Sequence, residues 1–451
     1  MSQAVQAAIN LIKQGKSGEA ERSLLLGLDE NPDNYEVLEM LAVLQADQGR
    51  WDEAVSAVRV NIEHQQPDAK KYQLLGTLLG ALGDEEAEQA YKMAIDTDPL
   101  VAGAYLELSH LDTVTEPVAL CKEIERKIEE AGVSGQLAST LHFSAGNLQR
   151  KAGEHEQAFS HYDQANTLAH KPFSVDEFNR SLAALKQVFT KDFFSARKKQ
   201  GFDTSAPLFL IGMPQSGAPV LERMLVNHSQ IATVGERADM MLLSELLGKI
   251  NRVSAGYPSS AKAVTAAQAQ MLGKTYLDKI RGQAGCKKVS AIIDNSTLNF
   301  LHVGLITLLL PQAKFVYLRR HPLNSCLSCY FQPYSEVHGV SYSLESLGEF
   351  YVGLTDLMAH WQEVLPGKIL EVDYEKLIAS PSKQLKQVLS FCGLEWESSC
   401  VDAGMDTRPT SINASLWQVR RTKYHSYDLN WQDYAAFIEP LQARLSAYLS
   451  K

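Results

Sequence analysis

The first 165 residues of the chain repeat at an interval of 34 residues. Gly15, Gly49 and Gly83 mark this interval, and Gly153 continues the series two intervals on. An acidic residue and an alanine follow each of the first three glycines, and each of these units ends on a proline after a helix-like run. Glycine at a turn, alanine where helices approach closely and proline at a helix end are typical of paired helices. The pattern therefore predicts four or five stacked helical pairs, with an unrelated helical bundle as the alternative.

A repeat of this length and composition resembles the tetratricopeptide repeat (TPR). The resemblance implies that residues 1–169 form an all-helical TPR solenoid. Residues 170–204 follow as a helical connector, in which we expect Phe189, Phe193 and Phe194 to pack between the two halves of the chain.

The pattern changes after residue 204, where short β-rich runs alternate with amphipathic helices. Strands are expected at 208–211, 289–293, 315–318 and 369–372. This alternation predicts that residues 205–451 form an α/β domain with a mostly parallel sheet and helices on both faces. Ligands bind at the carboxyl ends of the strands in sheets of this kind.

Residues 207–222 have the pattern of an apolar strand, a turn of small residues and the start of a helix. Backbone N–H groups converge on an anion in this geometry. Gln215, Ser216, Gly217 and Ala218 occupy the turn, which contains no Lys or Arg, and Pro219 removes one backbone donor. The sequence therefore predicts an anion site that lacks the side chains of a strong phosphate clamp.

Charge is divided unevenly along the chain. Residues 1–165 hold 13 Lys and Arg against 28 Asp and Glu, whereas the remaining residues hold 30 against 25. A basic half suits an anionic small ligand, and an acidic half suits a basic protein or peptide partner. We expect no nucleic acid as a target, because no basic stripe or aromatic platform stands out. We also expect no membrane partner, because no apolar run is long enough to span a bilayer.

Six cysteines are scattered over the 451 residues, which fits a reducing cytoplasm better than a disulfide framework. Cys326 and Cys329 have the spacing of a metal-binding pair, but zinc would need two more ligands at usable spacing. We therefore expect no metal ion, and we interpret both cysteines, with Tyr330 and Phe331, as the packing face of a helix.

Four segments of the second domain, taken together with the repeats, resemble the TPR sulfotransferases, which are relatives of the tyrosylprotein and heparan sulfotransferases. These segments are residues 212–222, 294–305, 319–331 and 417–426. The resemblance implies a P-loop-like α/β fold and an activity. The sulfuryl group of 3′-phosphoadenosine 5′-phosphosulfate (PAPS) would be transferred to a hydroxyl or amine, leaving 3′-phosphoadenosine 5′-phosphate (PAP).

The same resemblance implies roles for individual residues. Arg320 and Ser328 match the Arg and Ser with which the family binds the 3′-phosphate, and Glu236 stands where the family has its acceptor base. A guanidinium fork also suits a phosphate on physical grounds. The other residues that the resemblance assigns to the nucleotide site or the reaction are Gln215, Ser216, Gly217, Ala218, Asn295, Arg420 and Tyr424.

Several positions depart from the family's pattern. Gln215, Ala218 and Pro219 replace an Arg and two Thr, and Asn295 replaces a Lys thought to steady the leaving oxygen. A lost phosphate donor costs about ten- to a hundredfold in affinity. A lost transition-state donor costs on the order of 10²–10³ in rate. Two further replacements are His321 for an Asp, which we interpret as a solvated or structural histidine, and Asn430 for an Arg.

Two functions therefore remain open. The chain is a PAPS-dependent sulfotransferase with an altered donor site, whose repeats recruit the acceptor. Alternatively, it is a catalytically impaired sulfotransferase-like module that serves as a TPR interaction or nucleotide-sensing protein. The sequence favours the enzyme because five residues of the family's site are present: Glu236, Arg320, Ser328, Arg420 and Tyr424. It leaves the acceptor open among peptide tyrosine, saccharide and small metabolite.

Overall fold

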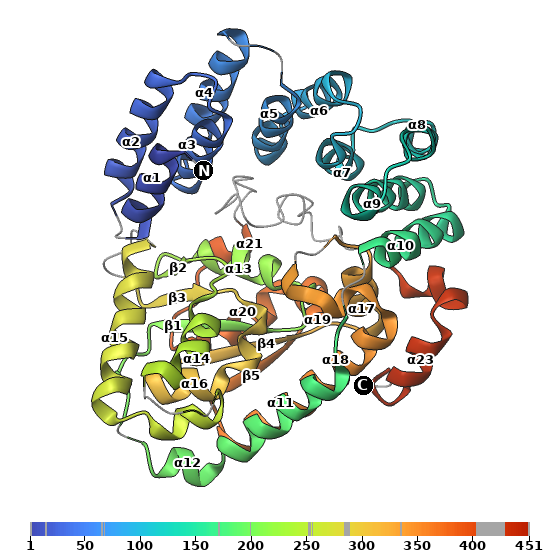
Figure 1. Cartoon of the computed structure of the whole chain (residues 1–451). Helices are drawn as coiled ribbons and strands as arrows, with labels where there is room; N and C mark the ends of the chain where they lie inside the picture. The colour runs from blue at the N-terminus through green and yellow to red at the C-terminus, as the bar shows by residue number, and fades with distance from the viewer. Residues whose placement is uncertain are drawn as a thin grey trace.

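The structure is a computed structural model of the chain. It describes residues 2–13, 16–64, 66, 68–169, 172–198, 200–250, 254, 256–283, 289–333, 336–402 and 429–449. A curved stack of helices forms an arch above an α/β domain (Figure 1). No helix within these ranges is long and apolar enough to cross a membrane.

Helices alone make up the described part of the arch. Consecutive helices pack on one another from α1 to α7, and α7, α8 and α10 all pack on α9. The helices are α1 (Gln3–Lys13), α2 (Ser17–Glu30), α3 (Tyr35–Asp47), α4 (Trp51–His64), α5 (Ala69–Leu82), α6 (Glu86–Thr97), α7 (Ala102–His110), α8 (Pro117–Ala131), α9 (Gly135–Lys151) and α10 (His155–Ala169).

The glycines that mark the sequence repeat occupy the turns between paired helices. Gly49, Gly83 and Gly153 have φ values of 78°, 78° and 81°. Glycine adopts this left-handed conformation without the steric cost that a Cβ would add. The predicted turn positions are confirmed at these three residues, while Gly15 lies outside the described ranges.

Two further glycines allow close packing within helical pairs. A Cβ on Gly76 would lie 2.6 Å from the Tyr91 ring, and a Cβ on Gly146 would lie 2.7 Å from the Tyr162 ring. Tyr91 and Tyr162 are both buried. The same contact thus recurs between α5 and α6 and between α9 and α10, as expected for a repeated unit.

The chain leaves the arch through α11 (Val175–Val188) and α12 (Lys191–Ser195). α11 runs along α18 (Leu344–Val364), where Phe178 stacks on Phe350 with ring centroids 5.0 Å apart. This path carries α12 to the side of the α/β domain that faces away from the arch (Figure 1).

The expected position of the connector phenylalanines is therefore wrong. Phe189 packs against Phe193, Phe194 and Trp361, and its ring would meet a Cβ on Gly304 at 2.5 Å. These contacts belong to the core of the α/β domain, because α11 spans that domain before the phenylalanines occur.

Aromatic residues of α10 occupy the boundary between the two halves instead. Tyr162 stacks on Phe331 with ring centroids 3.9 Å apart. The Tyr330 hydroxyl donates to Asp163 Oδ1 at 2.8 Å, and Asn166 Nδ2 donates to the Tyr330 carbonyl oxygen at 2.8 Å. α10 is therefore fixed to the α/β domain by stacking and by hydrogen bonds.

A five-stranded sheet forms the centre of the second half, in the order β2-β3-β1-β4-β5 with every pairing parallel. The strands are β1 (Pro207–Gly212), β2 (Ile231–Thr233), β3 (Ala291–Asp294), β4 (Lys314–Arg319) and β5 (Ile369–Asp373). The four strands expected from the sequence are confirmed. β2 was not predicted, because a run of three residues is too short to show a strand period.

Helices cover both faces of the sheet. Leu208 and Leu210 of β1 pack with the residues of α13 and α20, whereas Phe209 and Ile211 pack with those of α16 and α18. Burial on both faces explains why β1 is an unbroken apolar run. The covering and peripheral elements are α13 (Ala218–Val226), α14 (Asp239–Ile250), η1 (Ser259–Ala263), α15 (Ala266–Gln283), η2 (Thr297–Leu301), α16 (Val303–Leu309), α17 (Pro322–Tyr330), η3 (Glu336–Tyr342), α19 (Tyr374–Ala379), α20 (Pro381–Cys392), α21 (Ser399–Asp402), η4 (Trp431–Phe437), α23 (Glu439–Leu445) and η5 (Ser446–Tyr448).

Candidate active site

The loop from β1 to α13 lies at the carboxyl end of the central strand, where the strand order reverses. A ligand site is expected at this point of a parallel sheet. Gly217 is the N-cap of α13 with φ 94°, and a Cβ there would lie 2.2 Å from the Tyr374 ring. Gln215 has φ 65°, which is uncommon for a residue other than glycine. Tyr374 thus closes over the turn and holds it in a tight conformation.

Two small residues of the turn are almost completely buried. Ser216 and Ala218 are each 1% exposed. Ser216 Oγ has no hydrogen-bond partner within the described residues, although a buried hydroxyl normally has one. Ala218 packs in the apolar cluster of α13 and α20. The turn therefore offers one unused hydroxyl, and its Ala218 position has little room for a larger side chain.

Arg320 follows β4 directly and is 5% exposed. Its Nη1 donates to Ser328 Oγ at 3.0 Å and to the Gln215 carbonyl oxygen at 3.0 Å. The guanidinium carbon also lies 5.4 Å from the centre of the Tyr374 ring. The structure thus brings Arg320 and Ser328 together, as the family resemblance implies, and joins both to the β1–α13 loop.

The two cysteines of α17 serve packing. Cys326 and Cys329 are buried in the core, and the Cys329 thiol donates to the Pro214 carbonyl oxygen at 3.3 Å. The Cys326 thiol lies 3.8 Å from the Leu347 carbonyl oxygen. The interpretation of this pair as a packing face is confirmed.

A buried carboxylate that the sequence did not single out lies beneath the same edge of the sheet. Glu222 of α13 is 7% exposed and accepts hydrogen bonds from Thr233 Oγ1 and, at 2.7 Å, from Asn295 Nδ2. Burial raises the pKa of Glu222 to about 7, and the charge of Glu236 adds to this rise. The Asn295 amide is therefore committed to Glu222, and its Oδ1 has no partner within the described residues.

Glu236 lies just after β2, next to the end of β3. The Asn295 backbone N–H donates to the Gly235 carbonyl oxygen at 2.9 Å, which fixes the segment before Glu236. The Glu236 side chain is exposed, yet the protein around it raises the pKa of its carboxyl through desolvation. The next residue, Arg237, donates to Asp239 at 2.7 Å. The structure thus places Glu236 and Asn295 side by side at the carboxyl edge.

Asp294 is a second buried carboxyl at this edge, with 1% exposure. It accepts hydrogen bonds from the Tyr276 hydroxyl at 2.6 Å, the Ser296 backbone N–H at 3.0 Å and Asn299 Nδ2 at 3.2 Å. Burial nevertheless raises the pKa of Asp294 to about 7. This network holds the segment that carries Asn295.

A hollow of about 440 Å³ opens beside Arg320 at the carboxyl ends of β4 and β5. Its lining carries both signs of charge and includes Arg319, Arg320, His321, Asp373, Glu375 and Lys376. The His321 ring stacks on Trp431 with centroids 5.7 Å apart, and its backbone N–H donates to Glu375 Oε1 at 2.9 Å. His321 Nδ1 is buried without a partner in the described part of the chain. The stacking supports a structural role for His321.

The sequence-based site residues fall into two groups. The structure gathers the turn 215–218, Arg320 and Ser328 on one side, and Glu236 and Asn295 on the other, along one edge of the sheet. Arg420 and Tyr424 lie outside the described residues. Asn430 caps η4, with its side chain accepting from the Gln432 backbone N–H. Glu222 was missed because one glutamate on a helix gives no signal until β2 and β3 are placed around it.

Comparison with known proteins identifies the second half of the chain. The sequence model of the sulfotransferase family matches residues 207–398. An uncharacterized protein of Aquifex aeolicus (strain VF5) is 25% identical over 417 residues, which cover 90% of this chain and 54% of the relative. The chain thus spans about half the length of that curated relative.

Solved structures show weaker overall similarity. The sulfotransferase domain of the Synechococcus PCC 7002 olefin synthase is 18% identical with a TM-score of 0.32, over 54% of this chain and 96% of that domain. A sulfotransferase from Alicyclobacillus acidocaldarius is 14% identical with a TM-score of 0.30, over 55% of this chain and 96% of its own. MamA is 22% identical with a TM-score of 0.28, over 37% of this chain and 93% of its own.

The assignment rests on the family match, which begins at β1 and ends just before α21. Residues 207–398 are a sulfotransferase-family domain, preceded by a helical region.

Proposed function

We propose that the chain binds PAPS at the carboxyl edge of the sheet and transfers its sulfuryl group to a hydroxyl or amine. The observation that carries this proposal is the buried Arg320, which hydrogen-bonds Ser328 and the β1–α13 loop at once. Arginine held in a fixed geometry next to a helix N-terminus suits a phosphate group. The family assignment of residues 207–398 supports the same donor.

The residues at this edge fit part of the nucleotide. The unpartnered Ser216 hydroxyl and the N-terminus of α13 provide donors for an anion, and Arg320 with Ser328 provides a second anion position. Pro219, the second residue of α13, contributes no N–H. The site therefore fits an anionic nucleotide. Its β1–α13 loop offers one backbone donor fewer than it would without Pro219.

Glu236 would serve as the base of the reaction. PAPS, when bound, supplies the sulfuryl group. Glu236 takes the proton of the acceptor O–H or N–H as the acceptor atom attacks sulfur. The bond from sulfur to the bridging oxygen breaks, and PAP leaves. The raised pKa of Glu236 makes this carboxylate a stronger base than an ordinary glutamate.

One observation favours the alternative, a module that binds the nucleotide without useful turnover. Asn295 is neutral, and its amide donates to Glu222. A preorganised cation at that position would be worth on the order of 10²–10³ in rate. The alternative therefore keeps the binding role of Arg320 and Ser328 but not the transfer step.

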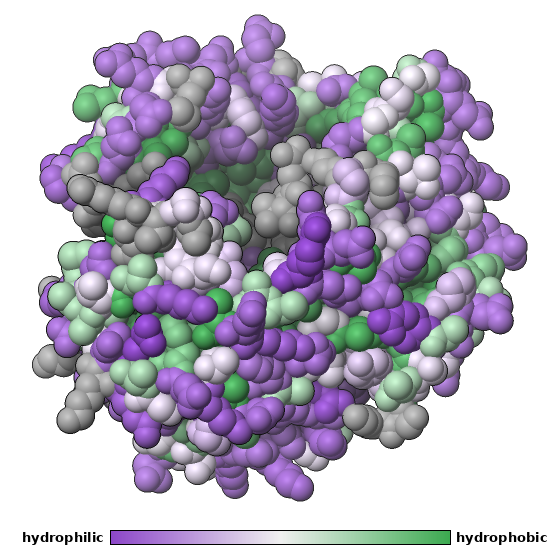
Figure 2. Space-filling view, turned by 60° about the horizontal axis from the view of Figure 1, so that its bottom comes forward, coloured by the Kyte–Doolittle hydropathy of each residue, from purple (hydrophilic) through white to green (hydrophobic). Residues whose placement is uncertain are grey.

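The helical arch supports a second part of the proposal. We infer that residues 1–169 are TPR repeats and that the arch recruits a basic protein or peptide as the acceptor or its carrier. The arch spans the side of the α/β domain on which α13 begins (Figure 1), and the surface between the two is hollowed (Figure 2). The excess of acidic residues in the arch favours a basic partner.

The two functions can be separated with a restored variant. Asn295→Lys would place an ammonium next to the Glu222 carboxylate, and Gln215→Arg would return a cation to the loop. The measurement is PAP formation from PAPS in the presence of phenols, sugars and tyrosine peptides. We expect turnover to rise by about 10²–10³-fold in the double variant.

Glu236→Gln serves as the matched control for this experiment. Added to the double variant, it should lower turnover by about 10²–10⁴-fold without changing PAPS binding. If the double variant binds PAPS tightly but forms no PAP with any acceptor, the transfer step is contradicted and the binding-only alternative holds.

A further inference from the structure

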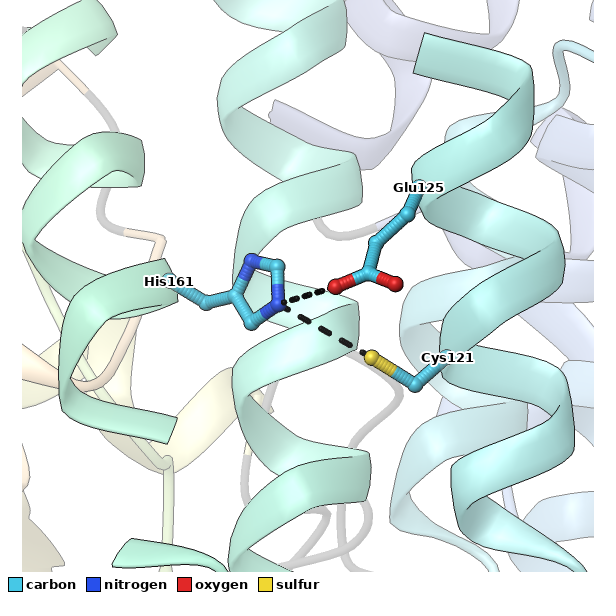
Figure 3. Close-up of side chains that lie close together, drawn as sticks. All are labelled: Cys121, Glu125 and His161. Atoms are coloured by element: carbon cyan, nitrogen blue, oxygen red, sulfur yellow. Dashed lines mark hydrogen bonds and ion pairs between the residues drawn. The ribbon is translucent and has the colours of Figure 1, made fainter. Parts of the chain in front are cut away.

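Three potential metal ligands converge between two helices of the arch, remote from the sulfotransferase-family site. Cys121 and Glu125 lie one turn apart on α8, and His161 faces them from α10 (Figure 3). Their ligand atoms all lie within 4.8 Å of one another. His161 Nε2 is 3.1 Å from Glu125 Oε1 and 3.8 Å from Cys121 Sγ.

These separations match those of ligands that share one metal ion. Zinc bonds of about 2.3 Å to sulfur and 2.0–2.1 Å to nitrogen or oxygen, at tetrahedral angles, separate N from S by about 3.5 Å and N from O by about 3.3 Å. The i, i+4 spacing of Cys121 and Glu125 places both on one face of α8. We propose that Cys121, Glu125 and His161 bind one divalent transition-metal ion, zinc or a chemically similar ion.

The residues around the three ligands are suited to support them. His142 Nδ1 lies 3.1 Å from His161 Nδ1, so the second ring nitrogen of His161 already has a partner. A metal-bound histidine usually donates its other N–H to such an acceptor.

The tautomers must change when the metal binds. Without metal, His161 Nε2–H donates to Glu125, and Nδ1 of His161 accepts from His142. A metal on Nε2 requires the proton of His161 on Nδ1. The proton of His142 must then lie on its Nε2, so that His161 Nδ1–H donates to the unprotonated Nδ1 of His142. The proton of the Cys121 thiol leaves to solvent as the sulfur–metal bond forms.

A fourth feature lies next to the sulfur. The Gln149 amide lies near the Cys121 thiol, and Gln149 Oε1 is buried with no hydrogen-bond partner in the described residues. Its amide oxygen is available as an acceptor for a water in the open coordination position. Glu125 is 42% exposed, which gives the metal a route from solvent.

Such a metal would join α8 to α10 across α9. α10 also carries Tyr162 and Asn166, which contact the α/β domain. The metal would therefore stiffen the helix through which the arch is attached. The three ligands lie outside the nucleotide site, so they can bind a metal whether or not the chain transfers sulfuryl groups.

The test uses the full chain freed of metal by a chelator and titrated with Zn²⁺, and in parallel with Co²⁺. We expect one ion per chain, a higher melting temperature and a thiolate-to-metal absorption band with Co²⁺. Cys121→Ser and His161→Gln should weaken binding at least about 100-fold, and His142→Gln about 10- to 100-fold.

Glu125→Gln is a second variant that we expect to fold, because the Glu125 side chain is partly exposed and glutamine has nearly the same size. It should weaken Zn²⁺ binding at least about tenfold. Cys392→Ser, on the partly buried cysteine that ends α20, is the matched control and should bind as the unaltered chain does. The proposal is overturned if the unaltered chain binds no Zn²⁺, if Co²⁺ gives no thiolate band, or if Cys121→Ser binds equally well.

Discussion

Glu222 shows how a single buried carboxyl can set the pH dependence of this domain. Its pKa is raised to about 7 from an ordinary value of 4.5, mainly because burial disfavours the charge. The folded state therefore holds this proton more tightly than the unfolded chain does. The resulting stability is fully present below pH 4.5 and is lost as pH rises through about 7.

Replacing Glu222 by glutamine should remove this loss. Glu222→Gln keeps the size of the side chain. Its amide oxygen can accept from Asn295 Nδ2, and its amide N–H can donate to Thr233 Oγ1 in place of the hydrogen bond that Glu222 accepts there. We therefore expect the variant to gain on the order of 3 kcal/mol relative to the unaltered chain between pH 4.5 and 8. Melting temperatures measured across that range check the prediction. Asp294 titrates in the same window with a pKa of about 7, so part of the pH dependence should remain. Equal pH profiles for the two proteins would contradict the burial of a charge at Glu222.

At the scale of elements, the β1–α13 loop depends on the absence of a side chain at Gly217. A Cβ there would lie 2.2 Å from the Tyr374 ring, and φ is 94°. Gly153 in the arch has a similar φ of 81° but nothing within 4 Å of its Cβ position. An alanine at Gly153 would therefore meet only the strain of the left-handed backbone, whereas an alanine at Gly217 would also clash with Tyr374.

We expect Gly217→Ala to destabilise the chain more than Gly153→Ala. Both substitutions cost about 1 kcal/mol for the left-handed conformation. Gly217→Ala adds about 1–3 kcal/mol for displacing Tyr374. Urea unfolding midpoints of the two variants check this difference. Equal midpoints would mean that Tyr374 does not close over the turn.

The elements also show what the sequence could predict. The helical pairs were predictable from their 34-residue repeat, and the four longer strands from short runs of apolar and β-branched residues between helical segments. β2 was not predictable from the sequence. Without β2, the contact between Glu222 and Thr233 could not be predicted either. Arg320 and Ser328 could be paired in advance because the resemblance to the sulfotransferase family implies an Arg and a Ser eight positions apart at these sites. The phenylalanines at 189, 193 and 194 were misplaced, because their aromatic spacing does not reveal that α11 first spans the domain.

On the scale of the whole molecule, an acidic arch stands above a more basic domain. Residues 1–165 carry 15 more acidic than basic residues, whereas the rest of the chain carries 5 more basic than acidic residues. Long-range attraction between the arch and a basic segment is screened over about 8–10 Å at 0.1–0.15 M salt. Binding of a basic partner should therefore depend on ionic strength.

We expect the full chain to bind a fluorescent Lys/Arg-rich peptide, with affinity falling as salt rises past about 0.15 M. A peptide of the same length with Glu in place of Lys and Arg is the control and should not bind. Fluorescence anisotropy at low and high salt is the measurement. Absence of binding, or binding that salt does not change, would leave the arch as a structural platform for the α/β domain.

We propose that Arg320 and Ser328 form part of a site for the 3′-phosphate of PAPS and PAP. A ligand that binds the folded chain raises its melting temperature by mass action. We predict that PAP raises the melting temperature of the unaltered chain and of Arg444→Ala, whose arginine pairs with Glu349 at the surface. Arg320→Ala should remain folded and lose the shift. No shift of the unaltered chain at millimolar PAP, or an unchanged shift in Arg320→Ala, would contradict the account.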